Sequence, residues 1–542
     1  MRLFLLAILA CCAASAQTTI TWRQLTSTGN PDTWPRWAAQ AFPKYDPVSG
    51  RILVYMQRPG GASNIYATDI YAWSPTTEQF TLIPGGLGTR SPASVNNCEA
   101  DTGASWPGQR HPDGQMVIDT TRNRMWFWGA LNQACAPNVS TNSTTTVTYV
   151  SGIQFFTGVG DGGWAGVPVI IGGNEYTIDS VTSATSLELT TPALSTTTAN
   201  ALIERYASAG RTAMWHMALN ADPTANTFTL LGFSGQPTGS PVFTFPVGHT
   251  YNNSTAVYSP DTDLIYVYRG DGLSKAMWTF NPATYAWAEM VLSAGTVNVS
   301  GTAVTRATGT PFVTDGSWAG KKFIVHSGGT RVDYTIASVE SADALTLTAS
   351  GGTKTGWDYG LRPSASKFVG MVYDEARQVI YLHGGQNNNG TAYFGETWKY
   401  TSLSATTGRF DLQCLSDCTP PPTYGEGASP AADNDGYPTF VHWNGKYVYH
   451  DDTSASRPGN YIFDPDTGVA GKWTPIQTGE GPISFLGVGS WDGTAALADN
   501  KILWLGKTGT GYADVWVGTL TATATNHRMR GSGKMQGSGR LQ

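Results

Sequence analysis

Residues 368–400, FVGMVYDEARQVIYLHGGQNNNGTAYFGETWKY, decide the fold of this chain. A short apolar run at 369–373 stops at Asp374, and a tight turn leads to a second run at 379–383 that is rich in β-branched and aromatic residues. Gly384 and Gly385 close that run, and an Asn/Gly-rich loop separates it from a third run at 397–400. Short apolar runs separated by turn residues predict three β-strands.

The order of these elements (strand, Asp turn, strand, Gly-Gly, loop, Trp-x-Tyr strand) resembles a kelch repeat, which forms one blade of a β-propeller. A single blade cannot bury both of its faces, so the fold requires further copies. The sequence provides six, and four of them have a proline in the turn before the last strand: Pro75, Pro223, Pro282 and Pro465. The six copies lie at about 38–83, 107–231, 255–290, 369–412, 439–476 and 493–520.

The last copy has no fourth strand, whereas Ile20–Leu25 reads as a last strand with no blade before it. Since an unpaired sheet edge invites aggregation, we expect this segment to complete the final blade and close the ring. The fold class is therefore predicted to be all-β, a six-bladed kelch-type propeller closed by its N-terminal strand. The alternative is a two-sheet sandwich whose turns coincide with the repeat.

Two segments, 146–206 and 295–359, interrupt the repeat and resemble each other. GWAG at 163–166 matches SWAG at 317–320, and EYTIDSV at 175–181 matches DYTIASV at 333–339. Alternating apolar residues and glycine turns predict one small β-barrel or sandwich present twice, protruding from the propeller. These modules resemble the appended β-domains of phage tail and bacterial surface proteins.

The predicted division of the chain follows from these boundaries. A signal peptide at 1–16 is followed by propeller segments at 17–145, 207–294 and 360–525, which surround the two modules. The last part, 526–542, is a basic Gly/Ser tail that contains RMRGSG and KMQGSG. That composition predicts disorder in isolation, and a docking tail that orders on a partner is the alternative.

The N-terminal segment MRLFLLAILACCAASA has the basic start, apolar core and small residues of a signal peptide cleaved near Ala16. A lipoprotein leader ending before Cys11 is the alternative. The apolar run is too short to span a bilayer, and we expect no membrane span elsewhere. We therefore expect a protein that is secreted, periplasmic or on the cell surface.

Composition favours short strands and argues against one class of partner, nucleic acid. Only 13% of residues are charged, the net charge is −6, and the chain contains 63 glycines. Low charge and many glycines suit short strands with tight turns. A nucleic-acid partner is excluded because it would require a clustered basic face.

Export permits disulfides, and four of the six cysteines remain once the leader is removed. Cys414 and Cys418 are close enough in sequence to close a small loop, which leaves Cys98 to pair with Cys135. The competing interpretation of the Cys-x-x-x-Cys pair is a zinc site, although no histidine or second cysteine pair lies nearby.

The loops that lead into the innermost strands carry cationic and aromatic residues. Propeller ligands usually bind where such loops meet, at the mouth of the central channel. Arginine binds anions, and aromatic rings stack on sugars, so a glycan or an exported protein is the predicted ligand. The alternative is that each residue braces its own loop. The predicted ligand-binding residues are Arg36, Trp37, Arg110, His111, His249, Tyr251, Lys367, Tyr437 and Trp491.

The sequence favours a non-enzymatic binding or adhesion scaffold, with no catalytic residue, metal or cofactor predicted. One alternative is a carbohydrate-active enzyme that uses the channel as an oxidase, lyase or hydrolase. Copper-radical oxidases of the galactose oxidase type share kelch propellers, and His111, His249, His442 and Tyr251 are available as ligands. The only plausible cross-linking cysteines, Cys98 and Cys135, are already assigned to a disulfide. Another alternative is a structural component of a cell-surface or virion-like assembly.

Overall fold

The computed structural model describes about three-fifths of the chain. The leader and the basic tail lie outside the described residues. Those residues are 18–25, 39–59, 66–83, 116–130, 138–151, 155, 168–172, 174–203, 212–233, 255–268, 277–327, 330–364, 369–385, 394–415, 439–451, 459–478, 494–507 and 513–522.

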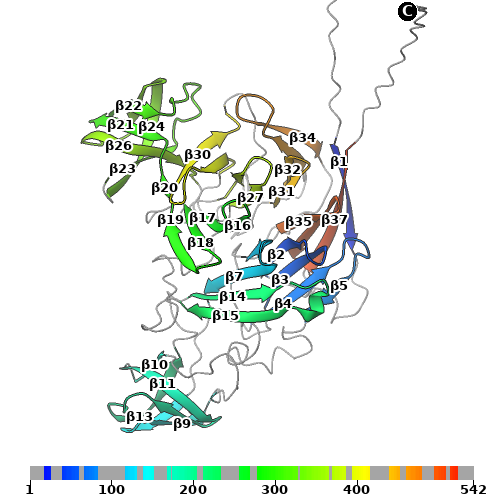
Figure 1. Cartoon of the computed structure of the whole chain (residues 1–542), viewed down its shortest axis with the longest axis vertical. Helices are drawn as coiled ribbons and strands as arrows, with labels where there is room; N and C mark the ends of the chain where they lie inside the picture. Colours follow the sequence, from blue (N-terminus) through cyan, green and yellow to red (C-terminus); the bar gives the residue numbers. More distant parts are fainter. Residues whose placement is uncertain are drawn as a thin grey trace, which may run out of the picture.

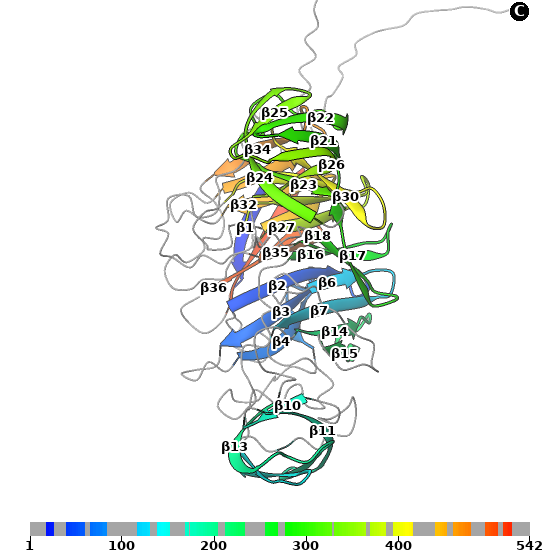
Figure 2. The ribbon, with the colours of Figure 1, turned by 90° about the vertical axis from the view of Figure 1, so that its left-hand side faces the viewer.

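The structure confirms the all-β class. Across the described residues, the strands form six separate sheets and two closed barrels, and the one helical element is a 3₁₀ turn at Pro223–Ala225. No helix in this part of the chain is long and apolar enough to cross a membrane. Figures 1 and 2 show the sheets grouped together, with the first barrel set apart at one end.

Four of the sheets follow the order of the chain, whereas the fourth and the sixth each take an outer strand from earlier in the chain. The first sheet contains β2 (Ala39–Asp46), β3 (Arg51–Pro59), β4 (Tyr66–Trp73) and β5 (Phe80–Leu82). The second contains β6 (Met116–Asp119), β7 (Arg124–Ala130), β14 (Thr212–Ala218) and β15 (Thr227–Phe233). The third contains β16 (Thr255–Ser259), β17 (Leu264–Tyr268), β18 (Met277–Asn281) and β19 (Ala286–Glu289).

The fourth sheet contains β27 (Gly370–Asp374), β28 (Val379–His383), β29 (Thr397–Ser402) and β30 (Thr407–Gln413), with the short β20 (Val291–Leu292) parallel to β30. The fifth contains β31 (Thr439–Trp443), β32 (Lys446–Asp451), β33 (Gly459–Asp464) and β34 (Lys472–Thr478). The sixth contains β35 (Thr494–Ala498), β36 (Lys501–Lys507), β37 (Ala513–Ala522) and β1 (Thr18–Leu25).

The first strand of each sheet, meaning β2, β6, β16, β27, β31 and β35, contacts the first strands of two other sheets. These contacts run from β2 to β6, β16, β27, β31 and β35 in turn, and then from β35 back to β2. Buried apolar clusters follow the same cycle. Leu53 packs with Phe127 between the first and second sheets, for example, and Val54 packs with Leu503 between the first and sixth.

Strand β1 completes the sixth sheet, as the sequence predicted. It pairs antiparallel with β37, with Thr18 opposite Ala522 and Leu25 opposite Val515. Ile20 is buried in the cluster shared with the fifth sheet, and the indole of Trp22 donates a 3.0 Å hydrogen bond to Asn460 on β33. The N-terminal strand thus joins two sheets as well as covering an edge.

A repeated ion pair ties neighbouring sheets together. Asp119 at the end of β6 is fully buried and accepts a hydrogen bond from the backbone N–H of Arg122 in the following turn. The Arg122 guanidinium lies 3.1 Å from Asp119 and 2.5 Å from Asp263 of the third sheet. Asp374, Arg377 and Asp466 repeat this arrangement between the fourth and fifth sheets.

The two inserted modules are six-stranded closed barrels. The first contains β8 (Asn138–Asn142), β9 (Thr146–Ser151), β10 (Pro168–Ile171), β11 (Asn174–Ser183), β12 (Ser186–Leu189) and β13 (Thr196–Ile203). The second contains β21 (Gly295–Ser300), β22 (Ala303–Gly309), β23 (Lys322–Ser327), β24 (Thr330–Ser341), β25 (Ala344–Leu347) and β26 (Thr353–Arg362).

The barrels share one strand order and also their irregularities. The register shifts between Ile178 and Ser180 in the first and between Ile336 and Ser338 in the second, which are matching positions of the sequence repeat. The first barrel begins at Asn138, eight residues before the predicted boundary at 146, because β8 pairs with β13 inside the barrel. The second ends at Arg362 rather than at 359.

The buried His383 makes stability depend on pH. It is 2% exposed between the fourth and fifth sheets, and its Nδ1 lies 2.9 Å from the Thr397 hydroxyl. Burial lowers the pKa of His383 to about 3. In the unfolded chain the imidazole takes up a proton near pH 6.5, so stability is complete above that pH and falls toward pH 3, by at most about 1.4 kcal/mol per pH unit. Urea unfolding at a series of pH values measures this slope.

The substitution His383→Leu removes the titrating ring and retains an apolar side chain. We expect it to lower stability at neutral pH, through loss of the bond to Thr397, and to reduce the acid slope. Equal slopes in the variant and the wild-type protein would show that His383 is not the acid-sensitive group.

Candidate functional site

A cavity of about 310 Å³ lies where the six first strands meet. Every first strand contributes to its wall, so we call it the axial cavity. Its wall is mainly apolar, and its polar side chains are Lys44, Tyr45, Tyr258, Tyr373 and His442. A pocket with an apolar wall and a few polar groups is the usual form of a small-molecule site.

Among the described residues of this wall, Lys44 is the only lysine or arginine. It lies on β2 two residues before Asp46, and the equivalent positions of the other first strands are valine or alanine: Val117, Val257, Val372, Val441 and Ala496. Lys44 is half-buried, and loss of water around its amine in this apolar wall lowers its pKa to about 8. Within the described part of the chain, no carboxylate lies within ion-pair distance of it.

Two tyrosines of the wall are held by carboxylates of the third sheet. The Tyr258 hydroxyl donates to Asp263 at 2.7 Å and accepts from the Thr121 hydroxyl at 2.6 Å. The Tyr373 hydroxyl donates to Asp261. Burial, together with these carboxylates, raises the pKa of both phenols, so both stay neutral and fixed in position near pH 7.

His442 on β31 adds an imidazole to the wall. Its Nε2 is buried and has no hydrogen-bond partner among the described residues. Burial lowers the pKa of His442, so the ring is neutral near pH 7. The cavity therefore combines a neutral imidazole with an amine that loses its proton only slightly above neutrality, and both can accept protons.

The residues predicted to bind ligand all lie outside the described residues. By sequence, each group of them comes a few residues before a first strand: Trp37 precedes β2, His111 precedes β6, and Tyr251 precedes β16, for example. The same relation holds for Lys367, Tyr437 and Trp491 with β27, β31 and β35. Their binding role remains a prediction.

The cysteine and metal predictions are tested only in part. Cys414 is disulfide-bonded. Cys98, Cys135 and Cys418 lie outside the described residues, so the pairings remain predictions. Of the copper-ligand candidates, His442 lines the axial cavity and the others are outside the described residues. Within the ranges that the structure covers, no three His, Cys, Asp or Glu side chains are grouped as a metal site would require.

Sequence reasoning missed Lys44, Tyr258 and Tyr373. An alignment of the six copies on the end of the first strand would have revealed Lys44, because it alone breaks a column of small apolar residues. The next position of the same alignment is a tyrosine or histidine in four of the six copies, which was a second indication of a site. Its residues are Tyr45, Ile118, Tyr258, Tyr373, His442 and Leu497.

No protein-family model matches the chain, and no curated protein matches it. Several solved structures do match the chain. The phage phi92 endosialidase is 11% identical with a TM-score of 0.35, and the match covers 97% of this chain and 72% of that one. An acylaminoacyl peptidase of Pyrococcus horikoshii is 9% identical with a TM-score of 0.29, covering 91% of this chain and 52% of that one. A GH74 enzyme of Niastella koreensis is 12% identical with a TM-score of 0.24, covering 89% and 60%.

The comparison corrects one prediction. The sequence favoured a non-enzymatic scaffold, yet these three structures are an endosialidase, a peptidase and a GH74 enzyme. The alternative, an enzyme that uses the central channel, fits them better. Since all three TM-scores lie below 0.5, we argue the reaction from the site itself.

Proposed function

We propose that the six sheets are the blades of a kelch-type propeller and that the chain is an exported carbohydrate-active enzyme working in the axial cavity. The closed cycle of first strands and the apolar clusters between successive sheets support the propeller. The position of Lys44 supports the enzyme, because a half-buried lysine in an apolar wall where six strands converge is unfavourable unless the amine has a use.

The reaction that suits this site best is eliminative cleavage of an acidic polysaccharide. In a uronic acid, the hydrogen on the carbon next to the carboxylate is weakly acidic. The neutral Lys44 amine takes that proton, the electrons form a carbon–carbon double bond, and the adjacent bond to the glycosidic oxygen breaks. Water protonates the leaving oxygen, so atoms and charge balance.

The surrounding residues have supporting roles in this proposal. Tyr373, fixed by Asp261, is only half-buried and offers its side chain to the sugar. The apolar wall lowers the pKa of Lys44 to about 8, so a fraction of the amine is free at neutral pH and most of it is free above pH 8.

The test is product analysis with the full mature chain on a panel of acidic and neutral polysaccharides. Elimination yields an unsaturated sugar that absorbs ultraviolet light, together with a new reducing end. Reducing ends without that absorbance would replace elimination with hydrolysis. If no polysaccharide in the panel were changed, the proposed activity would be wrong.

A further inference from the structure

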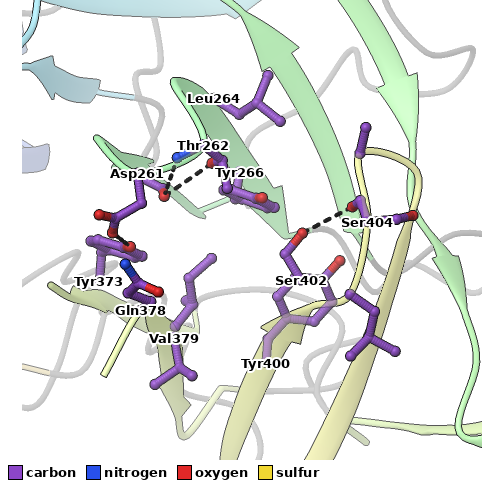
Figure 3. Close-up of a pocket in the computed structure, with 14 residues that line it drawn as sticks. Asp261, Thr262, Leu264, Tyr266, Tyr373, Gln378, Val379, Tyr400, Ser402 and Ser404 are labelled. Carbon is purple, nitrogen blue, oxygen red and sulfur yellow. Dashed lines mark hydrogen bonds between the residues drawn. The ribbon is translucent and has the colours of Figure 1, made fainter. Parts of the chain in front are cut away.

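A second cavity, of about 480 Å³, lies between the third and fourth sheets (Figure 3). We call it the lateral pocket. It is built from the turns after β16, β27 and β29, which contribute Asp261, Gln378 and Ser404. The turns after β16 and β27 follow the C-terminal ends of first strands, and β29 runs parallel to β27, so its turn lies at the same end. The predicted ligand-binding loops precede the N-terminal ends of the first strands. The lateral pocket is therefore at the opposite end of the sheets from those loops.

Two buried phenols of this pocket lack partners. Tyr266 on β17 and Tyr400 on β29 are each 1% exposed, and neither hydroxyl has a hydrogen-bond partner among the described residues. Their rings lie 5.9 Å apart. The Tyr400 hydroxyl fits only because residue 408 is a glycine. A Cβ at Gly408 would lie 2.0 Å from the Tyr400 hydroxyl oxygen. An unpaired buried hydroxyl costs about 1–3 kcal/mol, so two in one pocket require an explanation.

The rest of the wall is rich in hydroxyl groups and carries one acidic side chain. Ser402 donates a 3.0 Å hydrogen bond to the Ser404 carbonyl, and Thr262 lies 3.0 Å from the Ser259 hydroxyl. Asp261 accepts from Tyr373, as Figure 3 shows. Leu264 and Val379 supply apolar surface.

We propose that the lateral pocket binds one neutral sugar unit. Sugar hydroxyls both donate and accept, so they can bond to the serines of the wall. We infer that the rings of Tyr266 and Tyr400 shift toward the bound sugar, because their hydroxyls are fully buried in this structure and would gain partners only in that way. Leu264 and Val379 contact the apolar faces of the sugar. The Asp261 carboxylate disfavours an anionic ligand. The volume lies within the range of about 300–1,000 Å³ that is usual for ligand sites. This inference does not depend on catalysis in the axial cavity.

The test is calorimetric titration of the full chain with neutral mono- and disaccharides, and with a uronic acid for comparison. The variants Tyr266→Phe and Tyr400→Phe remove one oxygen each. We expect each to weaken neutral-sugar binding about five-fold, because one hydrogen bond is lost. We also expect an unchanged or higher thermal midpoint, because an unsatisfied group is removed. A merely structural hydroxyl would lower that midpoint.

Tyr381→Phe is the matched control. Tyr381 is also a buried tyrosine of the fourth sheet and follows Ile380 of the pocket directly, but it lines a different groove. We expect wild-type sugar affinity from it. Tyr266 and Tyr400 do not line the axial cavity, so a loss of affinity in their phenylalanine variants separates this site from that cavity. No binding of any neutral sugar, or equal loss in the Tyr381 control, would overturn the proposal.

Discussion

Deletion of Thr18–Leu25 is expected to destabilise the whole ring of sheets and to make the protein aggregate. The deletion exposes the full pairing edge of β37 and removes Ile20 from the cluster between the fifth and sixth sheets. Burial of the isoleucine alone contributes about 2 kcal/mol, and the lost strand hydrogen bonds and Trp22 packing add to it. An open, unpaired edge is also a template for association with other chains. Urea unfolding and light scattering measure the two effects.

A graft provides the control for this deletion. Because Thr18 pairs with Ala522, the start of β1 lies beside the end of β37, and a short turn can join them. The eight residues of β1 placed after Ala522 would form the same antiparallel pair as a hairpin. We expect this variant to regain solubility and most of the stability. If the deletion variant were monomeric and as stable as the wild-type chain, ring closure by β1 would be disproved.

Replacing Lys44 with methionine is expected to reduce turnover on the polysaccharide that the wild-type protein cleaves by at least about 100-fold, the usual contribution of a general base. Methionine is similar in length and suits the apolar wall of Val117, Val257 and Val372, so the fold should tolerate it. Steady-state kinetics give kcat and KM separately, and the main loss should be in kcat.

Lys446→Met is the control for the loss of a lysine elsewhere. Lys446 forms a 2.7 Å ion pair with Asp464 on the fifth sheet and does not line the axial cavity. Exposed ion pairs of this kind contribute less than about 1 kcal/mol, so both stability and turnover should stay near wild type. A turnover in Lys44→Met equal to that of this control would exclude Lys44 from the reaction.

The repeat in the sequence predicted much of the fold. The strand–turn–strand pattern around Asp374 located the fourth sheet, and the orphan segment at Ile20 was assigned correctly to the last sheet. The start of the first barrel was misplaced, because β8 (Asn138–Asn142) has too few apolar residues to stand out. Its partner strand in the barrel, β13, lies more than 50 residues later in the sequence, so the pairing could not be recognised locally.

The axial cavity was harder to predict, because its residues come together only when the six sheets close into a ring. No two of the first strands are neighbours in sequence, so Lys44 and His442 share a wall only after the chain has closed. The sequence pattern predicted ligand-binding residues in loops that contain arginine and aromatic residues, whereas Lys44 lies inside strand β2. The two phenols of the lateral pocket, Tyr266 and Tyr400, look like ordinary core residues in the sequence, and only their missing partners distinguish them.

The pH dependence of kcat/KM on an acidic polysaccharide, for the wild-type protein and Lys44→Arg, tests the catalytic assignment most directly. A base with a pKa of about 8 acts only when deprotonated, so we expect the wild-type value to rise with pH and level off above about 8. Arginine keeps the positive charge and cannot lose its proton, so that variant should be slow at every pH. An arginine variant with the rate and pH profile of the wild-type protein would contradict the account.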